Sequence, residues 1–79
     1  METEESTARK FSSQKLQLEI IWLEDSAELL IKMNRLEEAS LKLESALMIT
    51  QELEMAQKEA KICEKLGFIF YILSYHSYI

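Results

Sequence analysis

The chain has 79 residues, a formal net charge of −5 and a single cysteine, so it is long enough for one small domain and cannot form an internal disulfide. With 48% hydrophobic and 29% charged residues, its composition is not that of a disordered chain. The acidic balance argues against binding to nucleic acid or to an anionic membrane surface, because both need a basic face. We expect a folded domain in the cytoplasm, with the nucleus as the alternative location.

The composition of the middle of the chain predicts an all-α fold. There is no proline and only one glycine, Gly67, while Leu, Glu, Lys, Ala, Met and Gln are abundant, and these residues are strong helix formers. Residues 1–12 are polar and without pattern, so we expect a disordered N-terminal tail followed by a helical domain over residues 13–79.

The first predicted helix covers residues 13–33, with Ser12 or Ser13 as its N-terminal cap. Its apolar residues recur in steps of four and three, which places them on one helix face. Asn34 tolerates the left-handed conformation that closes a helix, so it predicts a turn there. The face consists of Leu16, Ile20, Leu23, Ala27 and Leu30.

The second predicted helix covers residues 36–53 and is also amphipathic. Its apolar series runs through Leu36, Ala39, Leu43, Ala46, Leu47 and Leu53. Positions 36, 39, 43, 46, 50 and 53 also alternate in steps of three and four, so a coiled-coil seam or a plain helical-hairpin core remains an alternative interpretation.

The third predicted helix covers residues 57–74 and ends in an uncharged aromatic segment. No Gly, Pro, Asn or Asp marks its junction with the second helix in "ELEMAQKEA", so one continuous helix from Leu36 to Leu73 is a rival. Beyond Lys65 the remaining 14 residues carry no charged side chain. That run is shorter than the roughly 18 residues that cross a bilayer, so we expect no membrane span. The predicted buried face consists of Ala56, Ala60, Cys63, Leu66, Gly67 and Phe70.

The spacing of small and large residues resembles the tetratricopeptide repeat (TPR) family. One complete repeat is suggested by Leu23, Ser26, Ala27, Leu30, Ala39, Leu43 and Ala46, and half of a second by Cys63, Leu66, Gly67 and Phe70. The two units are 40 residues apart, against about 34 in the common repeat, which is similar to a long-helix variant found in cell-polarity and spindle-orientation adaptors. Leucines replace two aromatics, and the closing proline is absent.

This resemblance implies a TPR-like helical domain with an incomplete second repeat, which acts as a protein–protein interaction adaptor and carries out no catalysis. The sequence contains no catalytic, cofactor-binding or metal-binding motif. In the resembling family the first helix of each repeat lines the ligand groove, so the implied partner-binding residues are Ile21, Glu24, Asp25, Glu28, Lys32, Lys61, Glu64, Lys65, Phe68 and Tyr71.

The aromatic C-terminal helix is expected to pack against a further helix or a second chain, because repeat units bury their cores only against neighbours. We therefore expect either a piece or short form of a longer repeat protein, or a homo-oligomer formed through this helix. The alternative function is a self-associating helical bundle without a separate ligand. A membrane-surface peptide is the weakest alternative, because the final helix has no Lys or Arg after Lys65.

Overall fold

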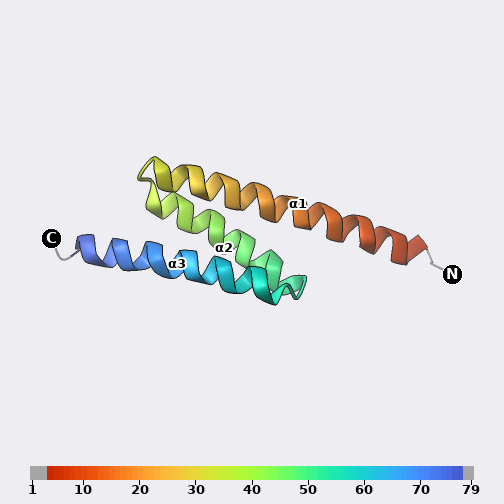
Figure 1. Cartoon of the computed structure of the whole chain (residues 1–79). Coiled ribbons are helices and arrows are strands. Elements are labelled where there is room, and N and C mark those ends of the chain that lie inside the picture. Colours follow the sequence, from red (N-terminus) through yellow and green to blue (C-terminus); the bar gives the residue numbers. More distant parts are fainter. Residues whose placement is uncertain (1–3, 78–79) are drawn as a thin grey trace.

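The protein, seen in a computed structural model, consists of three α-helices within the residues that the structure describes. These are residues 4–77 for the backbone and 12–75 for the side chains. Helix α1 spans Glu4–Lys32, α2 spans Leu36–Glu52 and α3 spans Ala56–Ser77. The helices run antiparallel to their neighbours in sequence (Figure 1). The predicted all-α class, with a helical hairpin followed by a third helix, is confirmed.

The two turns have the same geometry, and it explains where both helices stop. Asn34 and Glu54 have positive φ angles of 62° and 54°. In the first turn the amide of Arg35 donates to the carbonyl of Leu30 at 2.8 Å, and in the second the amide of Met55 donates to Thr50 at 2.9 Å. A left-handed residue followed by such a bond is a Schellman motif, which satisfies carbonyls at a helix C-terminus.

The second turn decides between the two expectations for residues 36–73. Left-handed Glu54 breaks the chain into two helices, so the rival continuous helix is wrong. The prediction of a left-handed turn at Asn34 is confirmed. Glutamate gave no sequence signal of this kind, because asparagine and glycine are the residues that favour the left-handed region.

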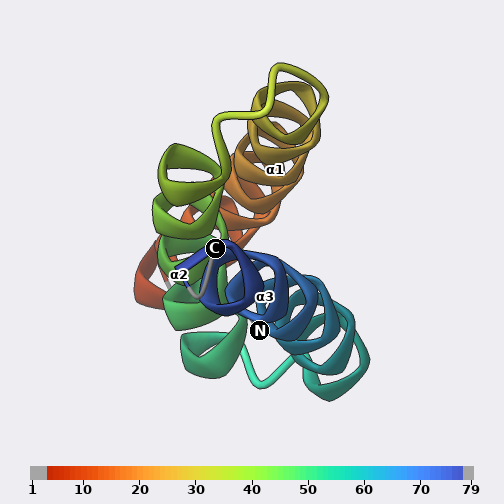
Figure 2. The same ribbon diagram turned by 90° about the vertical axis from the view of Figure 1, so that its left-hand side faces the viewer.

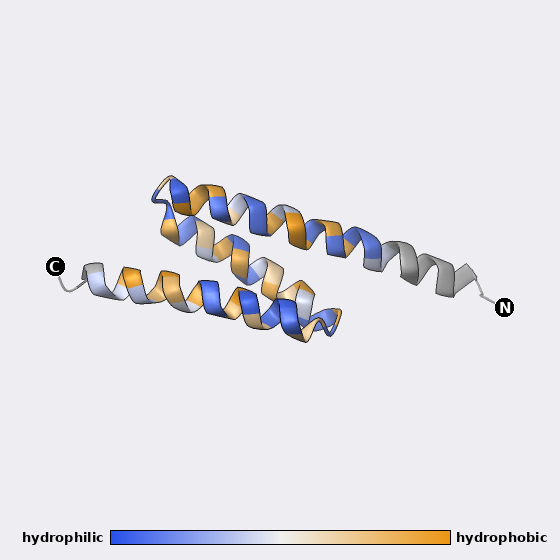
Figure 3. Ribbon diagram, in the orientation of Figure 1, coloured by the Kyte–Doolittle hydropathy of each residue, from blue (hydrophilic) through white to orange (hydrophobic). Residues whose placement is uncertain are grey.

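The core is one cluster to which all three helices contribute (Figure 3). Three alanines with no exposed surface, Ala27, Ala39 and Ala46, allow close approach of the helices, and larger aliphatic side chains fill the remaining space. Each fully buried Leu or Ile contributes about 1.5–3 kcal/mol relative to an exposed one. The other buried hydrophobic residues are Ile20, Leu23, Leu43, Ile62, Leu66 and Ile69.

The buried face of α3 is not the predicted one. The structure buries Ile62, Leu66 and Ile69, whereas of the predicted series only Leu66 is buried. The branched isoleucines fill more of the core than the smaller Ala and Cys side chains would. The others, Ala56, Ala60, Cys63, Gly67 and Phe70, are exposed.

Gly67 has no close neighbour that would require a glycine. A Cβ atom built on Gly67 meets nothing within 4 Å. Close packing against another helix of the same chain therefore does not explain the glycine, although the repeat resemblance placed Gly67 on a buried face.

Helix α1 begins earlier than predicted. It starts at Glu4 rather than residue 13, so neither Ser12 nor Ser13 is its cap, and Ser13 instead accepts a hydrogen bond from Gln17 Nε2 at 3.5 Å. Residues 4–12 contain neither proline nor glycine, so nothing stops the helix there. Residues 1–3 of the predicted tail lie outside the described residues.

Helix α2 packs against both α1 and α3. In Figure 2, α2 lies on one side of the molecule, while α3 and the C-terminal part of α1 lie on the other side, separated from each other. At 1.5 Å per residue the 29-residue α1 exceeds the 17-residue α2 by about 18 Å. Its N-terminal part therefore extends beyond the rest of the fold (Figure 1). None of the described helices is both long and apolar enough to span a membrane.

Candidate functional site

Two ion pairs join α1 to α3 on the side of the molecule that these helices share. Glu24 of α1 lies 3.2 Å from Lys58 of α3, and Glu28 lies 3.3 Å from Lys65. The acids are four residues apart on α1, and the lysines follow the same edge of α3, so the pairs are successive links between the helices. We call these four residues together with Lys61 the α1–α3 seam.

The two links differ in burial. The side chains of Glu24 and Lys58 are 16% and 33% exposed, whereas those of Glu28 and Lys65 are 57% and 36% exposed. The Glu24 Oε1 atom is buried and accepts no hydrogen bond of good geometry, although the Lys58 ammonium lies within ion-pair distance. The carboxylate of Glu24 therefore depends on Lys58 for its compensation.

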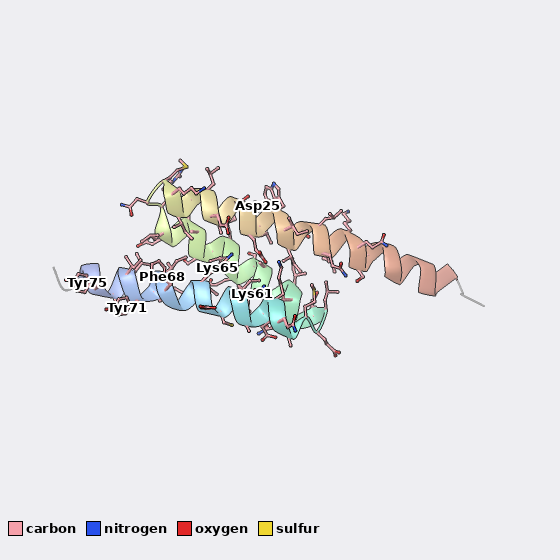
Figure 4. The ribbon with its side chains drawn as sticks, viewed as in Figure 1. Asp25, Lys61, Lys65, Phe68, Tyr71 and Tyr75 are labelled. Carbon is pink, nitrogen blue, oxygen red and sulfur yellow. The ribbon has the colours of Figure 1, made fainter. Side chains whose placement is uncertain are left out.

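Lys61 lies between the two paired lysines and makes no ion pair with any described residue. It lines two shallow hollows on α3, one with Glu64, Lys65 and Phe68 and the other with residues 55–58. Figure 4 shows Lys61, Lys65 and Phe68 on the edge of α3 nearest to α1 and α2. An exposed ammonium beside an exposed phenyl ring can bind a carboxylate and an apolar group that lie close together on one ligand.

Aromatic side chains continue this surface towards the C-terminal end of α3. Phe68, Tyr71 and Tyr75 are 60%, 71% and 61% exposed, and Figure 4 shows them in that order along the helix. Exposed aromatic rings are enriched at protein interfaces, since they present large area at low conformational cost.

The structure brings some of the predicted partner-binding residues together and leaves others apart. Lys61, Glu64, Lys65 and Phe68 line one hollow, and Glu28 is tied to Lys65. Glu24 is largely covered by its ion pair, so its carboxylate is less accessible than predicted. The remaining predicted residues, Ile21, Asp25, Lys32 and Tyr71, are exposed without forming part of that hollow.

The sequence analysis missed two residues of this surface, Lys58 and Tyr75. Lys58 precedes Lys61 and Lys65 in steps of three and four, so the helical spacing could have identified it. A further exposed aromatic, Trp22, lies elsewhere, with the Lys42 ammonium 5.5 Å from its ring centre. That cation–π contact links α1 to α2.

The described part of the chain contains no candidate metal site. No group of three or more His, Cys, Asp or Glu side chains there could hold a metal ion. The predicted burial of Cys63 is wrong, because its thiol is exposed on α3.

In comparisons with protein families, with curated proteins and with solved structures, no match to this chain was found.

Proposed function

We propose that this chain is a protein–protein interaction module of the TPR type, which binds a peptide segment of a partner protein along the α1–α3 seam and carries out no catalysis. The observation that carries the proposal is the unpaired Lys61 beside the exposed ring of Phe68, on a surface already fixed by two ion pairs. We place this activity in the cytoplasm, in keeping with the net charge of −5 and the single thiol.

The TPR assignment is supported by how the first unit packs. Five of its seven positions are buried, as close packing of a repeat requires, and Ser26 and Leu30 are half-buried; the five are Leu23, Ala27, Ala39, Leu43 and Ala46. Helix α2 packs against both α1 and α3, which is in keeping with a hairpin on which part of a further repeat stacks. In the second unit only Leu66 is buried, so the resemblance is carried mainly by residues 23–46.

The chemistry of the seam suggests the kind of segment that binds. A carboxylate on the ligand would pair with Lys61, and an apolar side chain two to four residues away would cover Phe68. Neither group needs to displace an existing ion pair. Exposed pairs alone contribute less than about 1 kcal/mol, so the apolar contact supplies most of the affinity.

Selection from a random peptide library displayed on phage, with the whole chain immobilised, tests the proposal. We expect selected peptides to combine an acidic with an aromatic or aliphatic residue, and to bind Lys61→Ala and Phe68→Asp variants at least about tenfold more weakly, as loss of about 1.4 kcal/mol requires. Trp22→Ala, on another exposed surface, is the matched control and should leave the affinity unchanged. Peptides that bind all variants equally would contradict the proposal.

A further inference from the structure

The side of α3 turned away from Phe68 is a second uncovered surface. Cys63, Gly67, Phe70 and Ser74 follow one another in steps of four, three and four, so they lie on one face of the helix. All four are exposed, and Phe70 retains 45% exposure. We call these four residues the outer face of α3.

The outer face has a projecting side chain at Phe70 and free space beside Gly67. The ring of Phe70 projects from it, while Gly67, one turn earlier, has nothing within 4 Å of where a Cβ would lie. Glycine inside a helix costs about 1 kcal/mol relative to alanine, and no contact within the chain accounts for it. A neighbouring helix that inserts a large side chain at Gly67 would account for both features.

From these features we propose that the outer face binds the outer face of a second copy of this chain, with the two α3 helices antiparallel. The sequence spacing is symmetric about the midpoint between Phe68 and Ile69. When two copies are aligned there, Phe70 of each lies opposite Gly67 of the other, and Cys63 lies opposite Ser74. The same surface is then used twice, as a two-fold interface requires.

The distribution of charge selects the antiparallel direction. The charged side chains of α3 all lie at or before Lys65, and its remaining residues are uncharged (Figure 3). In the antiparallel arrangement the charged half of one helix lies opposite the uncharged half of the other. A parallel arrangement would place Glu59, one turn before Cys63 on the same side of the helix, next to its own copy, where like charges repel.

The proposal is independent of peptide binding, because Phe68 and Phe70 project in different directions. Two residues correspond to about 200° around a helix, so a substitution at Phe68 leaves the outer face intact. Phe68→Asp is therefore a matched control for Phe70→Asp, with the same change of side chain on the same helix.

Light scattering on the purified full chain, over a wide range of concentration, tests the interface. We expect a species of twice the 9.3 kDa chain mass, retained in Phe68→Asp. In Phe70→Asp dimerisation should weaken by roughly a hundredfold or more, because two buried rings are lost. A chain that stays monomeric, or a dimer that survives Phe70→Asp, overturns the proposal. Circular dichroism establishes that each variant remains helical.

Gly67→Leu gives a second test that does not depend on a charged residue. The new side chain has free space in the monomer and a better helix propensity, so helicity should be retained or increased. In the dimer it would occupy the place of the partner ring, so the mass should fall to that of one chain. A Gly67→Leu protein that remains dimeric contradicts the insertion of Phe70.

Mild oxidation with diamide, which takes up two electrons and two protons as two thiols form a disulfide, tests the direction of pairing. In the proposed dimer the two Cys63 residues are about 16 Å apart along the helix axis, too far for a disulfide. The variant Ser74→Cys should become cross-linked rapidly, because the introduced thiol faces Cys63 of the other copy. Cross-linking of the unaltered chain at an equal rate would indicate parallel helices and overturn the proposal.

Discussion

The ion pair between Glu24 and Lys58 should stabilise the fold more than the pair between Glu28 and Lys65, although the two distances, 3.2 and 3.3 Å, are nearly equal. Coulomb attraction at that distance is about 5 kcal/mol at an effective dielectric constant near 20 but only about 1 kcal/mol in bulk water. The first pair is the more buried. After desolvation and side-chain ordering are subtracted, we expect a coupling energy of about 1–2 kcal/mol for the first pair and less than about 0.5 kcal/mol for the second.

A single substitution in the Glu24–Lys58 pair should cost more stability when the charged group that remains is the more buried one. Lys58→Met leaves the buried Glu24 oxygen without its counter-ion, whereas Glu24→Gln leaves an ammonium that is 33% exposed and can be hydrated. We therefore expect Lys58→Met to lower the free energy of unfolding by about 2 kcal/mol and Glu24→Gln by about 1 kcal/mol. The stability of the whole chain is roughly 4–12 kcal/mol at its length, so both effects are measurable.

Urea denaturation followed by circular dichroism measures both double-mutant cycles. At an m-value near 1 kcal/mol/M, a loss of 2 kcal/mol shifts the midpoint by about 2 M. The reasoning is refuted if the Glu28–Lys65 coupling equals or exceeds that of Glu24–Lys58, or if Glu24→Gln is the more damaging single change. Either result would mean that burial of the carboxylate does not govern the strength of the α1–α3 link.

Three further substitutions test the turns and the core, each by thermal and urea denaturation. Glu54→Gly should raise the free energy of unfolding by up to about 1 kcal/mol, because glycine adopts the positive φ without strain, whereas Glu44→Gly inside α2 should lower it. Leu43→Ala should lower it by about 2–5 kcal/mol, because Leu43 is fully buried; a loss below 1 kcal/mol would contradict its central place. Thr50→Val should change the free energy of unfolding by less than about 1 kcal/mol. The carbonyl of Leu47 accepts a hydrogen bond from the Thr50 hydroxyl, and it keeps its helical hydrogen bond when that hydroxyl is lost. A larger loss in Thr50→Val than in Thr50→Ala would contradict this.

The helices were predictable from the sequence because helix formers and apolar periodicity agree over most of the chain. The Asn34 turn was predictable as well, since asparagine accepts the left-handed conformation. The Glu54 turn was not, because there the hydrogen bonds of the Schellman motif and the packing of Met55 against the core override a weak local preference. Local propensity identifies a helix end only when the residue at the left-handed position is itself favourable.

The orientation of α3 was the main error, and it has a physical origin. Beyond Lys65 the helix is apolar on most of its circumference, so the periodicity contains no information about which side faces the core. Two series fit the helical spacing equally well, one through Gly67 and the other through Ile62 and Ile69. The structure selects the second because it offers larger branched side chains to a core that contains three fully buried alanines. Most residues of the α1–α3 seam were predicted from the sequence. The pairing of Glu24 with Lys58 was not, because it depends on how the helices are arranged in space.

A helix that is apolar on several sides needs more than one neighbour, and this requirement connects the two proposals. Helix α2 covers only the face of α3 that contains Ile62, Leu66 and Ile69. Phe68 and Phe70 stay exposed on different sides, and both rings lie beyond the last charge of the helix. The side near Lys61 can offer a ligand a charged contact as well as an apolar one, which suits a segment that binds and dissociates. The outer face has no charge and a gap that matches its own projecting ring, which suits a second copy of the chain. The two surfaces can therefore be occupied at the same time, and a dimer would present two seams to a partner.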